Sequence, residues 1–113
     1  MTVKLQSQTI LDSTYYCAYN TVMKITWDSD KAAANPKNHD GVTFEEAQHV
    51  LLDPFALTRE DDDALSEQRF ITLGMGSKGR ILVVVYTYRK ETMRLVSAWK
   101  ANEPQRRRYE SQF

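Results

Sequence analysis

Residues 79–89 read GRILVVVYTYR, and this stretch decides the fold that the sequence predicts. From Ile81 to Tyr88 every side chain is β-branched, aliphatic or aromatic, so apolar groups occupy both faces of an extended chain. Such a run is typical of a central strand that is buried on both sides. We therefore expect this strand to lie in the middle of a sheet.

Turn signals on both sides of this strand indicate which segments pair with it. The glycine-rich sequence GMGSKG precedes it at 74–79, and the polar residues 89–91 follow it. Short turns of this composition join antiparallel strands. We therefore expect strands at 69–73 and 93–98 that form a three-stranded meander with the central one.

The sequence upstream of the meander predicts a strand and then a helical turn. The strand is expected at 24–27, and either Asp28 or Ser29 can cap the turn that follows. Three consecutive alanines at 32–34 favour a helix. Pro36 disfavours its continuation, because the residue before a proline avoids helical geometry.

A second helix is predicted from a capping box. Thr43 is the expected N-cap and Glu46 follows three residues later, so the helix begins at Phe44. Pro54 ends it. The next segment, LTREDDDALS at 57–66, is polar and acidic, and we expect a loop.

The chain is predicted to end in a basic helix. Pro104 suits a first helical turn, so the helix begins near Glu103 and carries the sequence QRRRYE. The expected order is strand, two helices, three strands and a helix. This order predicts an α+β fold with one small antiparallel sheet.

Residues 1–22 show no clean period, and we interpret them as an N-terminal extension of a domain that spans 23–113. The alternative is an extra strand or helix, because Ile10, Leu11 and Tyr15 are apolar enough to pack.

Charge is distributed unevenly along the chain although the formal net charge is zero. Residues 64–113 carry ten Lys and Arg against four Asp and Glu, whereas residues 1–63 carry five against eleven. A small sheet with arginines beside a basic helix suits a polyanion such as RNA.

The composition argues against several classes of protein. No apolar run approaches the roughly 20 residues that a bilayer span requires. The single cysteine, Cys17, cannot form an internal disulfide, which fits a cytoplasmic protein. His39 and His49 lie apart, with no Cys/His cluster, so we expect neither a metal nor another cofactor.

Several stretches in a fixed order resemble the BrnT family, the toxin half of a type II toxin–antitoxin pair. They lie between residues 23 and 110 and read ITWDSDKAAANPKNHDGVTFEEA, SEQRFITLG, GRILVVVYTYR and RLVSAWKA, followed by RRRYE. The resemblance implies a RelE-like fold, with helices packed on one face of the sheet. It also implies a ribonuclease that cuts RNA without a metal and so inhibits translation. A BrnA-like antitoxin is the implied partner, and operator DNA is bound only through that antitoxin.

Metal-free RNA cleavage needs a base, a cation that stabilises the phosphorane, and an acid. Glu67 and Arg69 would share a face of a strand, as a candidate base and a phosphate clamp. Arg80, beside the glycine-rich turn, is the third candidate catalytic residue. The alternatives are an edge salt bridge for Glu67 or Arg69 and an exposed charge for Arg80.

Further candidates are RNA-binding residues. Arg94 and Lys100 have the same strand parity and would face RNA together if their face is the open one. Arg106 and Arg107 can contact phosphates or an acidic antitoxin surface, or form a solvated helix end. Trp99 can stack on a base.

Two positions depart from the family pattern. Trp99 and Gln105 stand where the family has an arginine and a glutamate. Neither can do the same chemistry, because an indole cannot clamp a phosphate and an amide cannot take a proton. The first alternative is therefore a catalytically weakened or inactive module that binds RNA and the antitoxin. The second is an RNA-independent structural partner in operon repression.

Overall fold

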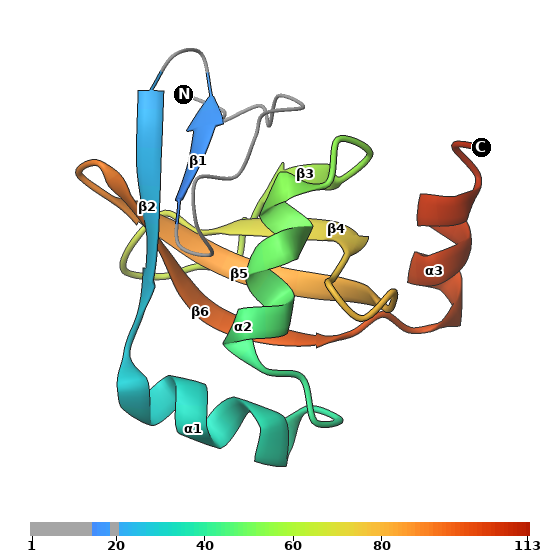
Figure 1. Cartoon of the computed structure of the whole chain (residues 1–113), viewed down its shortest axis with the longest axis horizontal. Coiled ribbons are helices and arrows are strands. Elements are labelled where there is room, and N and C mark those ends of the chain that lie inside the picture. The colour runs from blue at the N-terminus through green and yellow to red at the C-terminus, as the bar shows by residue number, and fades with distance from the viewer. Residues whose placement is uncertain (1–14, 19–20) are drawn as a thin grey trace.

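The computed structural model describes residues 15–18 and 21–113, which form one mixed sheet with helices around it (Figure 1). Within these residues, six strands lie in the order β1-β2-β6-β5-β4-β3. The strands are β1 Tyr15–Ala18, β2 Thr21–Trp27, β3 Leu57–Glu60, β4 Phe70–Met75, β5 Ile81–Arg89 and β6 Thr92–Lys100. The helices are α1 Ser29–Asn38, α2 Phe44–Ala47, the 3₁₀ helix η1 Gln48–Leu52, and α3 Glu103–Glu110. The predicted α+β class is confirmed.

The predicted central strand is β5. Every residue from Ile81 to Thr87 is buried, as its apolar composition requires. β4 and β6 flank it, and both pair with it antiparallel. The predicted meander is therefore present.

The sheet differs from the expected antiparallel one because β2 runs parallel to β6. Lys24 lies opposite Thr92, and Trp27 lies opposite Leu95. β2 leads directly into α1, which contacts the second half of β6. Because β2 runs parallel to β6, its last residue lies toward the second half of β6, and α1 begins there.

The predicted acidic loop begins as a strand. Residues 57–60 form β3, which pairs antiparallel with β4 at the edge of the sheet. Leu57 packs against the cluster around Leu73, whereas Arg59 and Glu60 stay exposed. The charges that suggested a loop are those that protect an edge strand from pairing with another chain.

The helix α1 continues through Pro36 to Asn38, beyond its predicted end. Its N-cap is Asp28, whose Oδ1 accepts a hydrogen bond from the Asp30 N–H at 3.1 Å. The buried side chain of Asn35 holds the helix in place by hydrogen bonds to β6 and to the following loop. A tertiary contact therefore overrides the local preference of the residue before proline.

The Asn35 side chain forms hydrogen bonds with the backbone of β6 beyond the point where β2 ends. Its Nδ2 donates to the carbonyls of Val42 and Ala98, both at 2.8 Å. Its Oδ1 accepts from the Ala98 N–H at 3.2 Å. The pairing of β2 with β6 stops at Leu95, so the amide takes the place of a neighbouring strand.

The helix α2 begins at Phe44, as predicted. Thr43 Oγ1 accepts from the Glu46 N–H at 3.0 Å, which is one half of the expected capping box. The Glu46 carboxylate does not return to the helix start, because it binds Arg80. η1 continues from α2 and ends at Leu52, just before the predicted stop.

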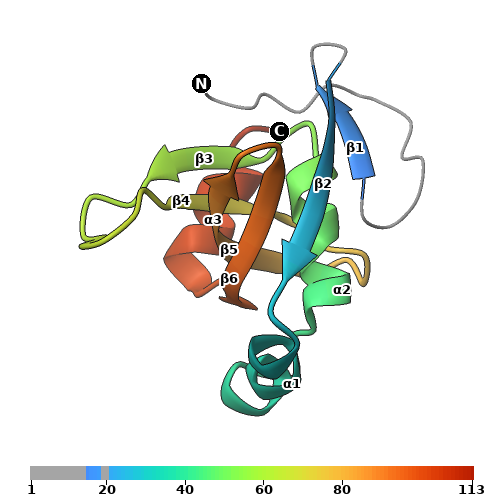
Figure 2. The ribbon, with the colours of Figure 1, turned by 90° about the vertical axis from the view of Figure 1, so that its left-hand side faces the viewer.

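The two faces of the sheet carry separate apolar clusters. As expected, helices cover one face, where α2 and η1 lie over the larger cluster. Its buried residues are Ile25, Val42, Phe44, Ala47, Val50, Leu51, Leu82, Val84, Tyr86, Met93, Leu95 and Ala98. On the other face, the smaller cluster comprises Leu73, Ile81, Val83, Ala101 and Tyr109. α3 therefore packs on the face opposite α2 (Figure 2).

The helix α3 begins at Glu103, as Pro104 predicted. Tyr109 is buried and anchors it, because its hydroxyl donates to Asp53 Oδ2 at 2.5 Å. The same carboxylate oxygen accepts from the Met75 N–H at 2.9 Å. Asp53 therefore joins α3, the end of β4 and the turn after η1.

The N-terminal segment contains a strand within its described part. β1 and β2 form an antiparallel hairpin, so an extra strand, the alternative for residues 1–22, is present. Ile10 and Leu11 lie outside the described residues. β2 starts at Thr21 and crosses position 23, where the domain boundary stays a prediction. None of the helices in the described part of the chain has the length and apolar character that a bilayer crossing requires.

Candidate nucleic-acid interface

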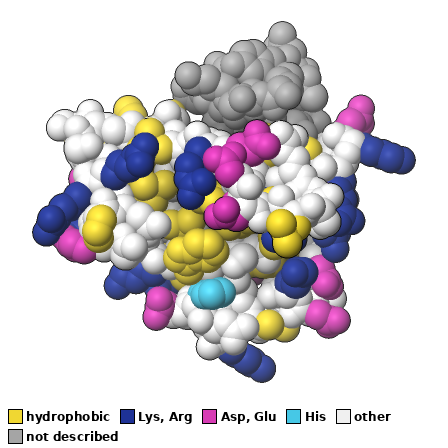
Figure 3. Space-filling view, turned by 180° about the vertical axis from the view of Figure 1, so that it is seen from behind, with side chains coloured by type: hydrophobic (Ala, Val, Ile, Leu, Met, Phe, Trp, Pro, Cys, Tyr) yellow, Lys and Arg dark blue, Asp and Glu magenta, His cyan; other side chains and the backbone are white. Residues whose placement is uncertain are grey.

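Among the described residues, α3 covers one end of the sheet face opposite α2, and we call the rest the open face. By strand register, the open face carries Ile71, Val85, Thr87, Arg94, Ser97 and Trp99. Figure 3 views the molecule from this side and shows apolar surface at its centre with charged side chains around it. The open face therefore combines an apolar surface with both basic and acidic side chains around it.

A β-bulge in β6 determines which side chains reach this face. The register passes from Val85 opposite Ser97 to Tyr86 opposite Leu95. Val96 is the extra residue between them. Such a bulge reverses the alternation of side chains along the strand.

The bulge separates two predicted RNA-binding residues. Arg94 lies opposite Thr87 on the open face, and Trp99 lies opposite Val83 on the same face. Lys100 lies opposite Leu82, which belongs to the cluster beneath α2. The expectation that Arg94 and Lys100 share a face is therefore wrong, because strict alternation does not continue through the bulge.

Arg69 lies immediately before β4. Its carbonyl accepts from the Asp61 N–H at 2.8 Å, so the pairing of β3 with β4 continues to this residue. Phe70 lies opposite Tyr86, and one further step of the register places Arg69 opposite Thr87 on the open face. Its Nε is buried and has no hydrogen-bond partner among the described residues.

Arg69 and Arg94 thus flank Thr87 in one row across β4, β5 and β6. Neither guanidinium forms an ion pair with a described residue. Two arginines on either side of β5, without an ion pair among the described residues, are suited to a phosphodiester backbone.

Arg80 does not join them. It lies at the opposite end of the β4–β5 hairpin and binds Glu46 of α2, from Nη2 to Oε1 at 2.6 Å and from Nε to Oε2 at 2.9 Å. Its Nη1 donates to the Asp40 carbonyl at 3.1 Å. Hydrogen bonding to Glu46 raises the pKa of Arg80 above its ordinary value. Arg80 therefore does not lie beside Arg69 as a group that could share a phosphate with it, and it has the geometry of a structural ion pair.

Glu67 lies in a bend before β4, so it does not share a strand face with Arg69. Its carboxylate accepts from Arg89 Nη2 at 3.2 Å. The side chains of Glu67 and Arg89 are 32% and 58% exposed, and a pair this accessible to water exchanges readily. The salt bridge was one of the two expectations for Glu67, and it leaves the carboxylate within reach of solvent.

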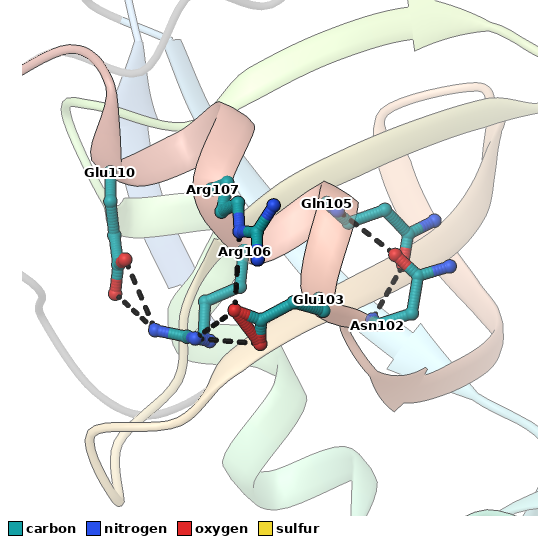
Figure 4. A network of polar contacts seen from close by, with 6 residues as sticks. All are labelled: Asn102, Glu103, Gln105, Arg106, Arg107 and Glu110. Carbon is teal, nitrogen blue, oxygen red and sulfur yellow. Dashed lines mark hydrogen bonds and ion pairs between the residues drawn. The ribbon is translucent and has the colours of Figure 1, made fainter.

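Arg106 and Arg107 are tied to acidic residues of their own helix (Figure 4). Arg106 binds Glu103 at 2.5 Å and Glu110 at 3.1 Å. Arg107 Nε lies 3.3 Å from Glu103 Oε1. These contacts fit the solvated helix end that was the alternative to phosphate binding.

Gln105 closes a capping box at the start of α3, also shown in Figure 4. Its N–H donates to Asn102 Oδ1 and its Oε1 accepts from the Asn102 N–H, both at 2.9 Å. A glutamate would make the same two contacts. The departure from the family pattern therefore preserves the helix and removes a charge.

Trp99 is partly buried, and its ring packs against the ring of His39 with centroids 5.8 Å apart. His39 is the C-cap of α1, where its N–H donates to the Asn35 carbonyl. The contact holds the indole at the margin of the open face.

Sequence reasoning missed a pocket of about 210 Å³ beside α3, which we call the α3 pocket. Leu57, Ile71, Leu73 and Val83 form its apolar part, and Arg59, Gln105 and Arg108 contribute polar groups. Arg59 lies in β3, a segment that the sequence predicts to be a loop. The spacing of Gln105 and Arg108, one turn apart on a helix, was the available signal.

The structure thus has an α+β fold with partly exposed arginines on the face opposite α2. The model of the family described as ribonuclease toxin, BrnT, of type II toxin–antitoxin system matches residues 27–104. The chain therefore belongs to the BrnT family. A search of curated proteins gave no match.

Proposed function

We propose that this chain is an endoribonuclease toxin that needs no metal and binds single-stranded RNA across the open face. The observation that carries the proposal is the row of Arg69 and Arg94 on either side of the buried Thr87, with both arginine side chains partly exposed on the face opposite α2. Family membership supports a ribonuclease toxin. A metal-free ribonuclease needs cations that stabilise the phosphorane, and this row of arginines supports the proposal for that reason.

The two arginines have a defined chemical task in this proposal. As the ribose 2′-oxygen loses its proton to the base and attacks the phosphorus, the bond from phosphorus to the 5′-oxygen breaks, and the 5′-oxygen leaves as a hydroxyl with a proton from solvent. Negative charge builds on the non-bridging oxygens during this step, and guanidinium groups stabilise it. Glu67 is the proposed base, because its carboxylate is partly exposed and its bond to Arg89 is accessible to water. Trp99 would stack on an adjacent base.

The direct test is cleavage of a defined single-stranded RNA in EDTA. We expect Arg69→Ala and Arg94→Ala each to reduce the rate about 100-fold or more, which is the usual effect of losing one transition-state donor. Glu67→Gln tests the base. The control is Lys31→Ala, which removes one exposed charge from α1. Equal rates in all variants would overturn the proposal.

A BrnA-like antitoxin is the proposed partner, and it would neutralise the toxin in the cytoplasm by covering the open face. Operator DNA would then be bound only through the antitoxin. Hydrogen exchange of the complex tests this, with protection expected at β4 and β6 and not at α1.

A second candidate is a binding module that holds RNA and the antitoxin without cutting. It is favoured by Gln105, an amide at a position where the family has a carboxylate, and by Trp99 in place of an arginine. Here wild type would bind RNA with strong salt dependence and show no cleavage. Cleavage that appears only in Gln105→Glu would identify the missing carboxylate, since the capping box tolerates this change.

A further inference from the structure

The α3 pocket lies beside the row of Arg69 and Arg94 and is built from different elements. Ile71 belongs to both the open face and the pocket, so the two surfaces are continuous. β3 forms one wall through Arg59, and α3 forms the other through Gln105 and Arg108.

The pocket has an apolar floor and a cationic rim. Leu73 and Val83 are buried in the floor, and Ile71 is partly exposed. Arg59 and Arg108 are both exposed, and neither forms an ion pair with a described residue. By contrast, the adjacent residues Arg106 and Arg107 both have carboxylate partners.

Gln105 gives the pocket a further polar group. Its Oε1 is used by the helix cap, but its Nε2 has no hydrogen-bond partner among the described residues. The cap fixes the side chain, so this amide is held in place as a donor at the pocket wall.

We propose that the α3 pocket is a nucleotide subsite in which one unstacked base of a single-stranded RNA lies on the apolar floor while Arg59 and Arg108 bind its phosphate. This proposal rests on the proposed function and extends it to a second part of the surface. The chemistry of the pocket matches that of a nucleotide, which presents a flat apolar face beside a dianionic or monoanionic phosphate.

Size and charge favour this ligand. At about 210 Å³ the pocket is smaller than the roughly 300–1,000 Å³ of sites for drug-sized molecules, so it accepts one ring system rather than an extended ligand. Two exposed guanidiniums without an ion pair among the described residues favour an anionic ligand, and the planar fork of arginine matches phosphate oxygens. The Gln105 amide can donate to an acceptor on the base edge.

The first experiment measures affinity for a single-stranded oligoribonucleotide over a range of salt concentrations. We expect the Arg59→Ala, Arg108→Ala double variant to bind at least tenfold more weakly, with a salt slope reduced by about 0.7 for the lost phosphate contact. Both residues are exposed, so the thermal midpoint should stay unchanged. The control is the Lys31→Ala, Lys37→Ala double variant, which removes the same number of positive charges from α1. The Lys31→Ala single variant is measured beside it.

The second experiment uses methyl NMR with adenosine 5′-monophosphate, uridine 5′-monophosphate and ribose 5-phosphate as probes. The nucleotides should shift the methyl signals of Ile71, Leu73 and Val83, and ribose 5-phosphate should not, because only a base reaches the floor.

The outcomes separate the two proposals. If wild type binds RNA and Arg94→Ala weakens it while the Arg59, Arg108 double variant does not, the subsite is overturned and the proposed function stands. If ribose 5-phosphate shifts the floor methyls as strongly as the nucleotides, the base-binding role is overturned. If wild type shows no salt-dependent RNA binding, the proposed function itself fails.

Discussion

Arg80 holds both carboxylate oxygens of Glu46, a residue that is only 1% exposed, at the end of the sheet far from Arg69. The pair joins the start of β5 to α2 across the larger apolar cluster. It leaves Arg80 as part of the scaffold in this structure, although the sequence suggested a phosphate ligand.

We expect Arg80→Ala to lower the free energy of unfolding by about 3–5 kcal/mol, because it leaves the Glu46 carboxylate buried without its partner. Glu46→Gln should cost less, since the amide keeps a hydrogen bond and the Arg80 side chain is 30% exposed and can be hydrated. Urea unfolding measures both. The Glu46→Met, Arg80→Met double variant should recover most of the stability and keep RNA cleavage. A stable double variant without cleavage would assign Arg80 a role in the reaction.

Replacement of Asn35 should detach α1 from β6. Asn35→Ala leaves the carbonyls of Val42 and Ala98 and the Ala98 N–H without their partner, so we expect a loss of about 3 kcal/mol. Amide exchange at Ala98 should accelerate. Asn38→Ala is the matched control, because Asn38 lies in the same helix and is exposed. Equal losses in the two variants would refute the role of the Asn35 amide.

The bond between Tyr109 and Asp53 should make stability depend on pH in the alkaline range. Burial, together with Asp53, raises the pKa of Tyr109 above its ordinary value of about 10. A raised pKa stabilises the fold fully below pH about 10 and progressively less as the pH rises above it. Tyr109→Phe should cost about 2 kcal/mol at pH 7.

The measurement for Tyr109 is the difference in urea midpoint between wild type and Tyr109→Phe from pH 7 to pH 11. This difference should be constant up to about pH 9 and shrink above about pH 10. A difference that grows with pH would contradict the proposed hydrogen bond.

The bulge at Val96 predicts different effects for two cations on the same strand. Arg94→Ala should weaken RNA binding and lower the salt slope by about 0.7, because it removes a cation from the open face. Lys100→Ala removes the same charge from the opposite face and should leave the slope unchanged. Filter binding at several salt concentrations compares them, and equal slopes would place RNA outside the open face.

Local chemistry determined most of the elements, and they could be predicted from the sequence. The apolar run from Ile81 places β5 at the centre, Thr43 starts α2, and Pro104 marks the start of α3. Each signal acts within a few residues, through burial, capping or a fixed backbone angle. The family was recognisable for a related reason, because its motifs are local stretches in a set order.

The site could not be predicted in the same way, because it depends on which distant residues meet. Arg80 forms an ion pair with Glu46, and Arg106 forms one with Glu103, so neither guanidinium is free for a phosphate. One extra residue, Val96, moves Lys100 to the other face.

The sequence by itself therefore determined most of the elements, the fold class and the concentration of positive charge in the second half of the chain. Only the tertiary structure decided which arginines lack an ion pair with any described residue, namely Arg69 and Arg94 in a row, with Arg59 and Arg108 beside α3. The physical reason is the separation along the chain over which each interaction acts. Strand and helix preferences act between neighbours, whereas an ion pair or a shared sheet face depends on register and on packing between residues far apart in the chain.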